Sequence, residues 1–141
     1  MRVLLIALTA VMSLTVAAVA VAEHEVYYRF TVLGYVKDAH GKPLADTTVE
    51  LIRDKTGLTY FGASDSDGFY AVRAHLGDES RGEGLTVRHG ANVRHVTAAF
   101  DPANHTDERG TRVDFLGARS VEQATLFHAT WVDAVAAASR H

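Results

Sequence analysis

The amino-acid sequence predicts an all-β fold, a seven-stranded sandwich with a leader helix before it and an amphipathic helix after it. Apolar and polar residues alternate in short runs between residues 26 and 117, as expected of half-buried strands. Turn signals separate these runs at intervals of about ten residues, which is typical of a sandwich. The chain has 141 residues, the length of a single domain. We expect a leader at residues 1–22, the sandwich at residues 23–118 and the helical region at residues 119–141.

The leader is an apolar segment whose one charge is Arg2. Ala20 and Ala22 stand at positions −3 and −1 of a signal-peptidase site before Glu23, so residues 1–22 are interpreted as a secretory signal peptide. The alternative is an uncleaved membrane anchor, because the run is long enough to span a bilayer. We expect a periplasmic or secreted protein with no membrane span after cleavage.

Charge and cysteine content narrow the functional classes. The 119 residues after the leader hold 17 acids and 13 bases, a net charge of −4, which argues against a general nucleic-acid binder because such proteins usually carry a basic face. The chain has no cysteine, so an exported domain must be stabilised by its core without disulfides. A length of 119 residues is sufficient for such a core.

The first predicted strand shows the period-two pattern clearly. Tyr28, Phe30 and Val32 alternate with Arg29 and Thr31, so one face is apolar and the other polar. The other six strands are expected around residues 49–51, 59–63, 70–76, 85–87, 93–100 and 111–116. Turn clusters at residues 38–43, 55–57, 65–68 and 90–92 connect them.

Two longer polar segments, residues 77–84 and 101–110, are expected to be loops. Their acidic pairs, Asp78-Glu79 and Asp107-Glu108, are interpreted as solvated loop charges because acidic side chains rarely lie buried without partners.

The C-terminal region has helical periodicity. Ser120 and Gln123 fit a capping box, and apolar residues then recur at spacings of three and four, at Ala124, Phe127, Trp131, Val135 and Ala138. This spacing predicts an amphipathic helix over residues 121–139. Phe127 and Trp131 either pack across one edge of the sandwich or form a docking surface for a partner protein or a membrane.

Two sequence blocks resemble the opening of a carboxypeptidase regulatory-like domain of the transthyretin-like (prealbumin-like) group. The first block, residues 34–44, carries Gly34, Asp38, Gly41 and Pro43, and a Val-Glu-Leu strand follows it at residues 49–51. The second block, residues 64–70, carries Asp65, Gly68 and Tyr70. The resemblance implies a Greek-key, transthyretin-like sandwich that serves as an accessory domain in exported proteins, and it says little about a specific function.

The residue types of these blocks have structural explanations. Gly41 and Gly68 permit positive φ in turns, and Asp38 and Asp65 can accept hydrogen bonds from backbone N–H groups ahead of them. Calcium binding at Asp65 and Asp67 is the alternative, but the later ligands of an EF-hand loop are absent from this segment.

Catalysis has little support in the sequence. The chain has no cysteine and no Gly-x-Ser-x-Gly elbow. It also lacks the Tyr-Arg-Gly-Ser ending of hydroxyisourate hydrolases and the local Tyr and His spacing of intradiol dioxygenases, two families similar in fold. We therefore expect a protein that is not an enzyme and has no cofactor.

Histidine is abundant, with eight residues. His89 and His95 flank a predicted hairpin turn, and His105 lies in the following loop. If the His89 and His95 imidazoles approach each other, Asp101 or His105 could complete a site for zinc, copper or nickel; the alternatives are solvated side chains or a pH sensor. His24 would be the second residue of the mature chain, whereas copper proteins that use a terminal histidine place it first.

These observations predict an exported, non-catalytic accessory or binding module that acts through contact with an envelope protein. One alternative is a periplasmic metal-binding protein that uses His89, His95 and His105. Another is a small-ligand or glycan-binding domain with an exposed aromatic patch, unless the C-terminal helix covers it. The candidate patch residues are Leu33, Tyr35, Tyr60 and Phe61.

Overall fold

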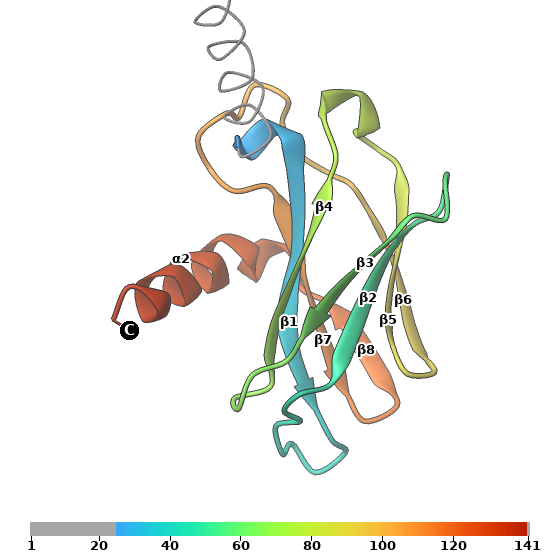
Figure 1. Cartoon of the computed structure of the whole chain (residues 1–141), viewed down its shortest axis with the longest axis vertical. Helices are drawn as coiled ribbons and strands as arrows, with labels where there is room; N and C mark the ends of the chain where they lie inside the picture. The colour runs from blue at the N-terminus through green and yellow to red at the C-terminus, as the bar shows by residue number, and fades with distance from the viewer. Residues whose placement is uncertain (1–24, 141) are drawn as a thin grey trace, which may run out of the picture.

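The computed structural model describes residues 25–140, which form a β-sandwich of two four-stranded sheets and one C-terminal helix (Figure 1). The first sheet has the order β4-β1-β7-β8 and the second the order β3-β2-β5-β6. The elements are η1 (Val26–Tyr28), β1 (Arg29–Lys37), β2 (Thr48–Arg53), β3 (Thr59–Ala63), β4 (Phe69–His75), η2 (Asp78–Ser80), β5 (Gly84–His89), β6 (Asn92–Thr97), β7 (Gly110–Leu116), β8 (Arg119–Glu122), η3 (Ala124–Leu126) and α2 (Phe127–Ala138). The expected leader at residues 1–22 and His24 lie outside the described residues.

The predicted β-sandwich is confirmed, but the expected count of seven strands is not, because residues 25–140 contain eight. The additional strand, β8, pairs antiparallel with β7 and occupies the segment in which the helix was expected to begin. In the first sheet β1 pairs antiparallel with β4 and parallel with β7. All strand pairs of the second sheet are antiparallel.

The predicted capping box is wrong. Ser120 lies within β8, and its hydroxyl donates to the backbone oxygen of Val93 at 3.4 Å. Gln123 instead donates its side-chain amide to Asp114 at 2.8 Å. The helix therefore begins at Phe127 rather than near residue 121, because pairing with β7 supplies backbone hydrogen bonds over the whole of β8, whereas a cap supplies two.

The core fills the space between the sheets with side chains at alternating positions of the strands, but the predicted first strand is only partly right. Tyr28, expected on its apolar face, lies in η1 and is 43% exposed, and Thr31, expected on its polar face, is buried. The buried residues of the core are Phe30, Val32, Val36, Val49, Leu51, Tyr70, Val72, Ala74, Leu76, Leu85, Val87, Val96, Ala98, Val113 and Phe115. Tyr70 is the polar exception: its hydroxyl donates to the backbone oxygen of Val113 at 2.6 Å. Burial raises the pKa of Tyr70 well above its ordinary value, so this hydroxyl stays protonated and the buried hydrogen bond stabilises the core.

Aspartate side chains hold one turn in each of the two sequence blocks, residues 34–44 and 64–70, that resemble a carboxypeptidase regulatory-like domain. Asp38 accepts hydrogen bonds from the backbone N–H groups of His40 and Lys42, both at 2.9 Å. The bond from Lys42 is the main cause of the lowered pKa of Asp38. Asp65 accepts from the backbone N–H groups of Asp67 and Phe69 at 2.8 and 3.0 Å. Each turn closes through a glycine with positive φ, 84° at Gly41 and 78° at Gly68.

The interpretation of Glu108 as a solvated loop charge is wrong. Its carboxylate is buried and accepts hydrogen bonds from Arg29 at 2.7 Å and from Thr31 at 2.8 Å. The adjacent Arg109 is also buried; it donates to Asp78 at 2.7 Å, and its guanidinium lies over the Phe100 ring at 4.3 Å. These bonds fix the end of the sandwich from which β1 begins, because each buried charge has a partner there.

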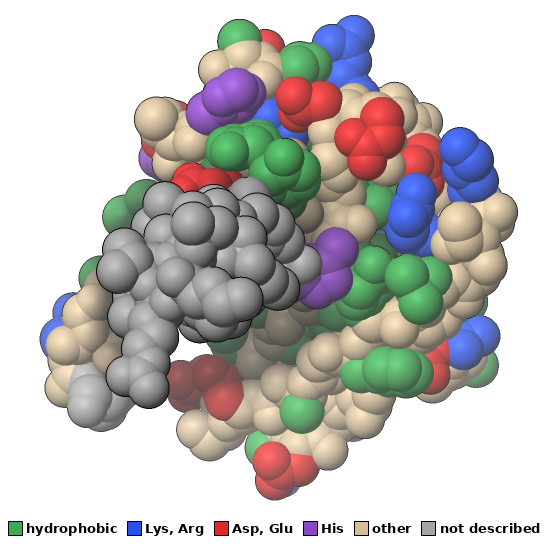
Figure 2. All heavy atoms as spheres, turned by 45° about the horizontal axis from the view of Figure 1, so that its top comes forward, with side chains coloured by type: hydrophobic (Ala, Val, Ile, Leu, Met, Phe, Trp, Pro, Cys, Tyr) green, Lys and Arg blue, Asp and Glu red, His purple; other side chains and the backbone are tan. Residues whose placement is uncertain are grey.

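The end of the molecule at the top of Figure 1 carries acidic and basic side chains spread among hydrophobic ones (Figure 2). Within residues 25–140, no helix has both the length and the apolar character needed to cross a membrane.

Candidate functional site

Helix α2 packs on the outer face of the first sheet and projects away from it (Figure 1). Phe127, only 5% exposed, anchors its first turn. A Cβ placed on Gly110 would lie 2.6 Å from the Phe127 ring, so glycine at this position of β7 makes room for the anchor. Leu33 is fully buried on the same outer face of β1, although it is not part of the core between the sheets.

The structure separates the two residues that the sequence suggested for partner docking. Phe127 packs against the sandwich, which is the alternative role considered for it, and Trp131 is half-buried. The large apolar residues exposed on η3 and α2 are instead Leu126, Val132 and Val135. Helical periodicity identifies the apolar positions of a helix, but it cannot say which of them the sheet covers.

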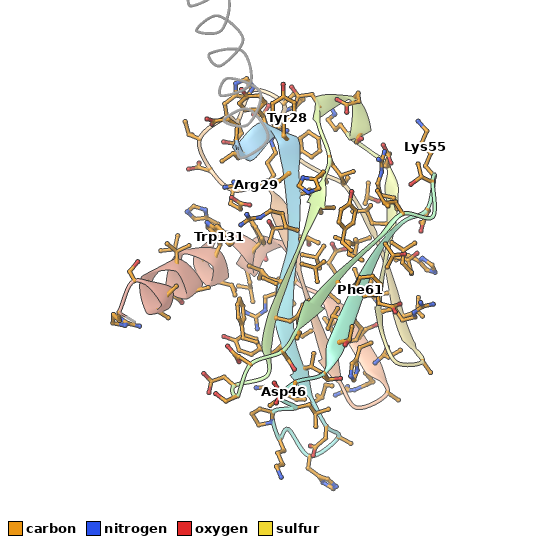
Figure 3. All side chains as sticks on the ribbon, viewed as in Figure 1. Tyr28, Arg29, Asp46, Lys55, Phe61 and Trp131 are labelled. Carbon is orange, nitrogen blue, oxygen red and sulfur yellow. The ribbon has the colours of Figure 1, made fainter. Side chains whose placement is uncertain are left out.

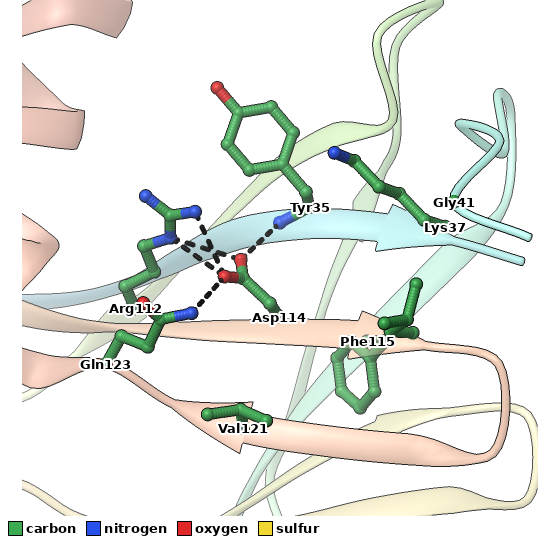
Figure 4. Close-up of a pocket in the computed structure, with 9 residues that line it drawn as sticks. Tyr35, Lys37, Gly41, Arg112, Asp114, Phe115, Val121 and Gln123 are labelled. Carbon is green, nitrogen blue, oxygen red and sulfur yellow. Dashed lines mark hydrogen bonds and ion pairs between the residues drawn. The ribbon is translucent and has the colours of Figure 1, made fainter. Parts of the chain in front are cut away.

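Beneath α2 lies a polar cluster centred on Asp114 (Figure 4). Its carboxylate accepts hydrogen bonds from the backbone N–H of Tyr35 at 3.0 Å, from Arg112 Nε at 3.1 Å and from the Gln123 amide at 2.8 Å. Arg112 Nη2 completes an ion pair with Asp114 at 3.0 Å. The cluster joins β1 and β7 to the segment that leads from β8 into the helix.

Arg112 extends this cluster to the helix itself. Its Nη1 donates to the Thr130 hydroxyl at 3.0 Å, and that hydroxyl donates to the backbone oxygen of Leu126 at 2.7 Å. The guanidinium lies 5.2 Å from the centre of the Tyr35 ring, and the Tyr35 ring meets Phe69 edge to face at 5.5 Å. Arg112 therefore orients both α2 and the aromatic pair.

A cleft of about 690 Å³ opens between α2 and the turn that joins β3 to β4. Its lining residues are Tyr35, Asp65, Ser66, Asp67, Phe69, Arg112, Thr130, Asp133, Ala134, Ala137, Ala138 and Arg140. Tyr35 and Phe69 supply its aromatic surface, and the helix supplies small apolar side chains. A second cleft of about 380 Å³, drawn in Figure 4, lies on the β8 side of the Asp114 cluster and is lined in part by Lys37 and Val121.

The first of these clefts, which we call the α2 cleft, has an acidic rim. Asp65, Asp67 and Asp133 contribute three carboxylates, and no ion pair to them is found within the described residues. Arg112 is paired with Asp114, so Arg140 is the one unpaired base of the lining among residues 25–140. The excess of carboxylates makes the α2 cleft complementary to a cationic ligand.

The three candidate metal ligands do not come together. His89 and His95 belong to paired strands, but His95 lies opposite Thr86, three residues from His89, so their side chains lie on opposite faces of the sheet. His89 bonds Thr47 at 2.9 Å, and His95 bonds Thr86 at 3.1 Å. His105 packs on the Tyr27 ring at 4.7 Å. Across the described range no three His, Asp or Glu side chains form a metal-binding group, so the metal hypothesis has no support in this geometry.

Sequence reasoning missed Arg112, Asp114, Gln123 and Thr130 as a group. The one local signal was the Arg-x-Asp spacing of residues 112 and 114, which places both side chains on one face of a strand. That signal does not separate a solvated surface pair from a cluster covered by a distant helix.

No protein-family model matches this chain, and no curated protein matches it either. Among solved structures, it is similar to the dioxygenase domain of a dioxygenase carbohydrate-binding protein fusion from the cellulolytic bacterium Streptomyces sp. SirexAA-E, with 21% identity over 63% of this chain and 79% of that one, at a TM-score of 0.40. It is also similar to chlorocatechol 1,2-dioxygenase from Pseudomonas putida, with 16% identity over 62% of this chain and 59% of that one, at a TM-score of 0.40. Neither likeness is close enough to bear on what this chain does.

Proposed function

We propose that this chain is an exported, non-catalytic binding module that takes a basic segment of an envelope protein into the α2 cleft. The observation that carries the proposal is the rim of three carboxylates that have no ion-pair partner within residues 25–140, on a cleft with aromatic and methyl-bearing walls. A lysine or arginine side chain fits such a site, because its charged head can reach the carboxylates while its methylene stem packs on apolar surface.

Charge and apolar contact contribute unequally to this recognition. An ion pair at an exposed rim is worth about 0.2–1 kcal/mol, so three carboxylates alone cannot hold a partner tightly. The Tyr35 and Phe69 rings and the helix residues Ala134 and Ala137 add surface that excludes water. We therefore expect the carboxylates to select a ligand of positive charge and the walls of the cleft to supply much of its affinity.

The lining of the cleft favours binding over catalysis. None of its twelve residues is a histidine or cysteine, so the lining offers no imidazole to activate its one serine, Ser66. The Thr130 hydroxyl already donates to a backbone oxygen and accepts from Arg112. The resemblance to carboxypeptidase regulatory-like domains implies the same accessory role. On the same basis we propose that the sandwich has the Greek-key, transthyretin-like topology of that group.

Reversal of two rim charges tests the proposed ligand. We expect the mature protein to bind a peptide of alternating lysine and alanine, and to ignore the same peptide with glutamate in place of lysine. The double variant Asp67→Lys, Asp133→Lys should weaken binding at least tenfold, because the local field changes sign. Fluorescence anisotropy with labelled peptides measures both effects, and added salt should weaken the wild-type interaction.

Asp107→Lys is the matched control, because Asp107 is exposed in a loop outside the cleft and the substitution changes the net charge by the same amount per site. It should leave peptide affinity within about twofold. Equal binding of the glutamate peptide, an unchanged affinity in the double variant, or binding of oligosaccharides in place of the lysine peptide would overturn the proposal.

Export rests on the proposed signal peptide at residues 1–22. Expression of the full chain in a bacterial host with a periplasm should yield a mature protein that begins at Glu23. Intact-mass measurement of protein released from the periplasm checks this expectation. A membrane-bound product that retains residues 1–22 would instead establish the anchor alternative.

A further inference from the structure

The outer face of the second sheet carries a row of four side chains, one from each strand. Strand register places Phe61 of β3 opposite Glu50 of β2, Glu50 opposite Arg88 of β5, and Arg88 opposite Val93 of β6. Directly paired residues of antiparallel strands share a face, so the row runs straight across the sheet. In Figure 3, Phe61 lies on the opposite side of the sandwich from Trp131 and α2.

Both ends of this row are exposed apolar residues. Phe61 is 64% exposed and Val93 is 42% exposed, and no helix among residues 25–140 packs on this sheet. Between them, Arg88 Nε donates to Glu50 at 2.6 Å and its Nη2 forms an ion pair with the same carboxylate oxygen. The row therefore has the order apolar, acidic, basic, apolar.

This order is complementary to itself. When a second copy is turned by a two-fold axis that runs parallel to the strands between β2 and β5, Glu50 of one copy faces Arg88 of the other. The same rotation sets Phe61 against Val93. A two-fold interface requires such a self-matching surface, in which each contact occurs twice.

The neighbouring row obeys the same symmetry. Its members are Thr59, Ile52, Thr86 and His95, in strand order from β3 to β6. The rotation places Ile52 against Thr86 and Thr59 against His95, so it brings no like charges together. Two sheets stacked this way keep their strands aligned, as sheets in sandwiches commonly do.

We infer that the outer face of β3-β2-β5-β6 is a homodimer interface, with a second copy of this chain as its occupant. Four strands of five or six residues cover a flat area of about 400 Å² on each copy, about half of what stable complexes bury per partner. The dimer is therefore weak and forms with rising concentration. It leaves the α2 cleft open, because that cleft lies on the opposite sheet.

A charge-exchange experiment tests the interface apart from the internal Glu50–Arg88 pair. Sedimentation velocity of the mature protein should show monomers at micromolar and dimers at millimolar concentration. Glu50→Arg and Arg88→Glu should each weaken self-association at least tenfold, since each places like charges opposite one another. An equimolar mixture of the two variants should associate again, because every cross-copy pair in the mixed dimer is then an arginine facing a glutamate.

Glu79→Arg and Arg73→Glu are the matched controls, since both residues are exposed outside this face and carry the same charge changes. Each should dimerise like the wild type. Phe61→Ser removes an end of the row without changing charge and should also yield monomers. The inference is overturned by a wild type that stays monomeric at millimolar concentration, by single variants that dimerise like the wild type, or by a mixture of folded variants that does not associate.

Discussion

Replacement of Gly34 by alanine is expected to lower the free energy of unfolding by about 4 kcal/mol. A Cβ at this position would lie 1.9 Å from the backbone oxygen of Val113 on the neighbouring strand β7. The oxygen cannot withdraw without cost, since it also accepts the buried Tyr70 hydroxyl and β7 is paired on both sides. Thermal unfolding followed by circular dichroism should show a midpoint lower by about 15 °C.

A second glycine provides the control for this prediction. Gly90 has φ of 57°, and a Cβ placed on it would meet no atom within 4 Å. Asparagine tolerates this backbone region, so Gly90→Asn should change the free energy of unfolding by less than about 1 kcal/mol. A Gly34→Ala protein as stable as Gly90→Asn would show that β1 and β7 are not held as closely as described.

Removal of the Asp114 carboxylate is expected to have the second largest effect. Asp114→Ala leaves the partly buried guanidinium of Arg112 and the backbone N–H of Tyr35 without their acceptor. The expected loss is about 2 kcal/mol of unfolding free energy. Because Arg112 also holds Thr130, amide hydrogen exchange in α2 should become faster, and the α2 cleft should bind the lysine peptide more weakly.

A double-mutant cycle separates the ion pair from simple truncation of a side chain. Arg112→Leu removes the charge that Asp114→Ala leaves unpaired, so the double variant should lose less stability than the sum of the two single losses. Asp114→Asn keeps an acceptor for the Tyr35 N–H and should cost less than alanine. If the losses of unfolding free energy in the cycle were strictly additive, Arg112 and Asp114 would not interact and the cluster would be contradicted.

The strands were predictable because their signal is local. Alternation in segments such as residues 70–76 marks which side chains face the core, and the register of β4 with β1 follows it. Turn chemistry is equally local: Asp65 and Gly68 lie within four residues of the backbone groups that they serve. Both signals can be recognised from neighbouring residues, without knowledge of any distant contact.

The start of the helix was not predictable for the opposite reason. The Ser120 and Gln123 spacing satisfied a local capping rule, but β7, which precedes them in the chain, offered a full ladder of hydrogen bonds to β8. Tertiary pairing overrides a weak local preference when it satisfies more backbone groups. The same competition explains Glu108, a loop residue in the sequence that becomes a buried partner of Arg29.

The histidines show a further limit of sequence spacing. His89 and His95 are six residues apart around a turn, which places them on neighbouring strands. This spacing does not determine whether their side chains lie on the same face of the sheet. The register of β5 with β6 decides it, because His95 pairs with Thr86 rather than with His89. A change of register by one residue would move one imidazole to the other face.

The sequence by itself determined that this chain builds a β-sandwich with a helix at its end, because periodicity and turn residues act over a few neighbouring positions. Only the tertiary structure decided which surfaces are available for the proposed ligand and for a second copy of the chain. The Asp114 cluster, the α2 cleft and the row from Phe61 to Val93 each join residues from three or more separate elements. Their chemistry depends on which strands become neighbours, and that choice is made by the packing of the whole chain rather than by any one segment of it.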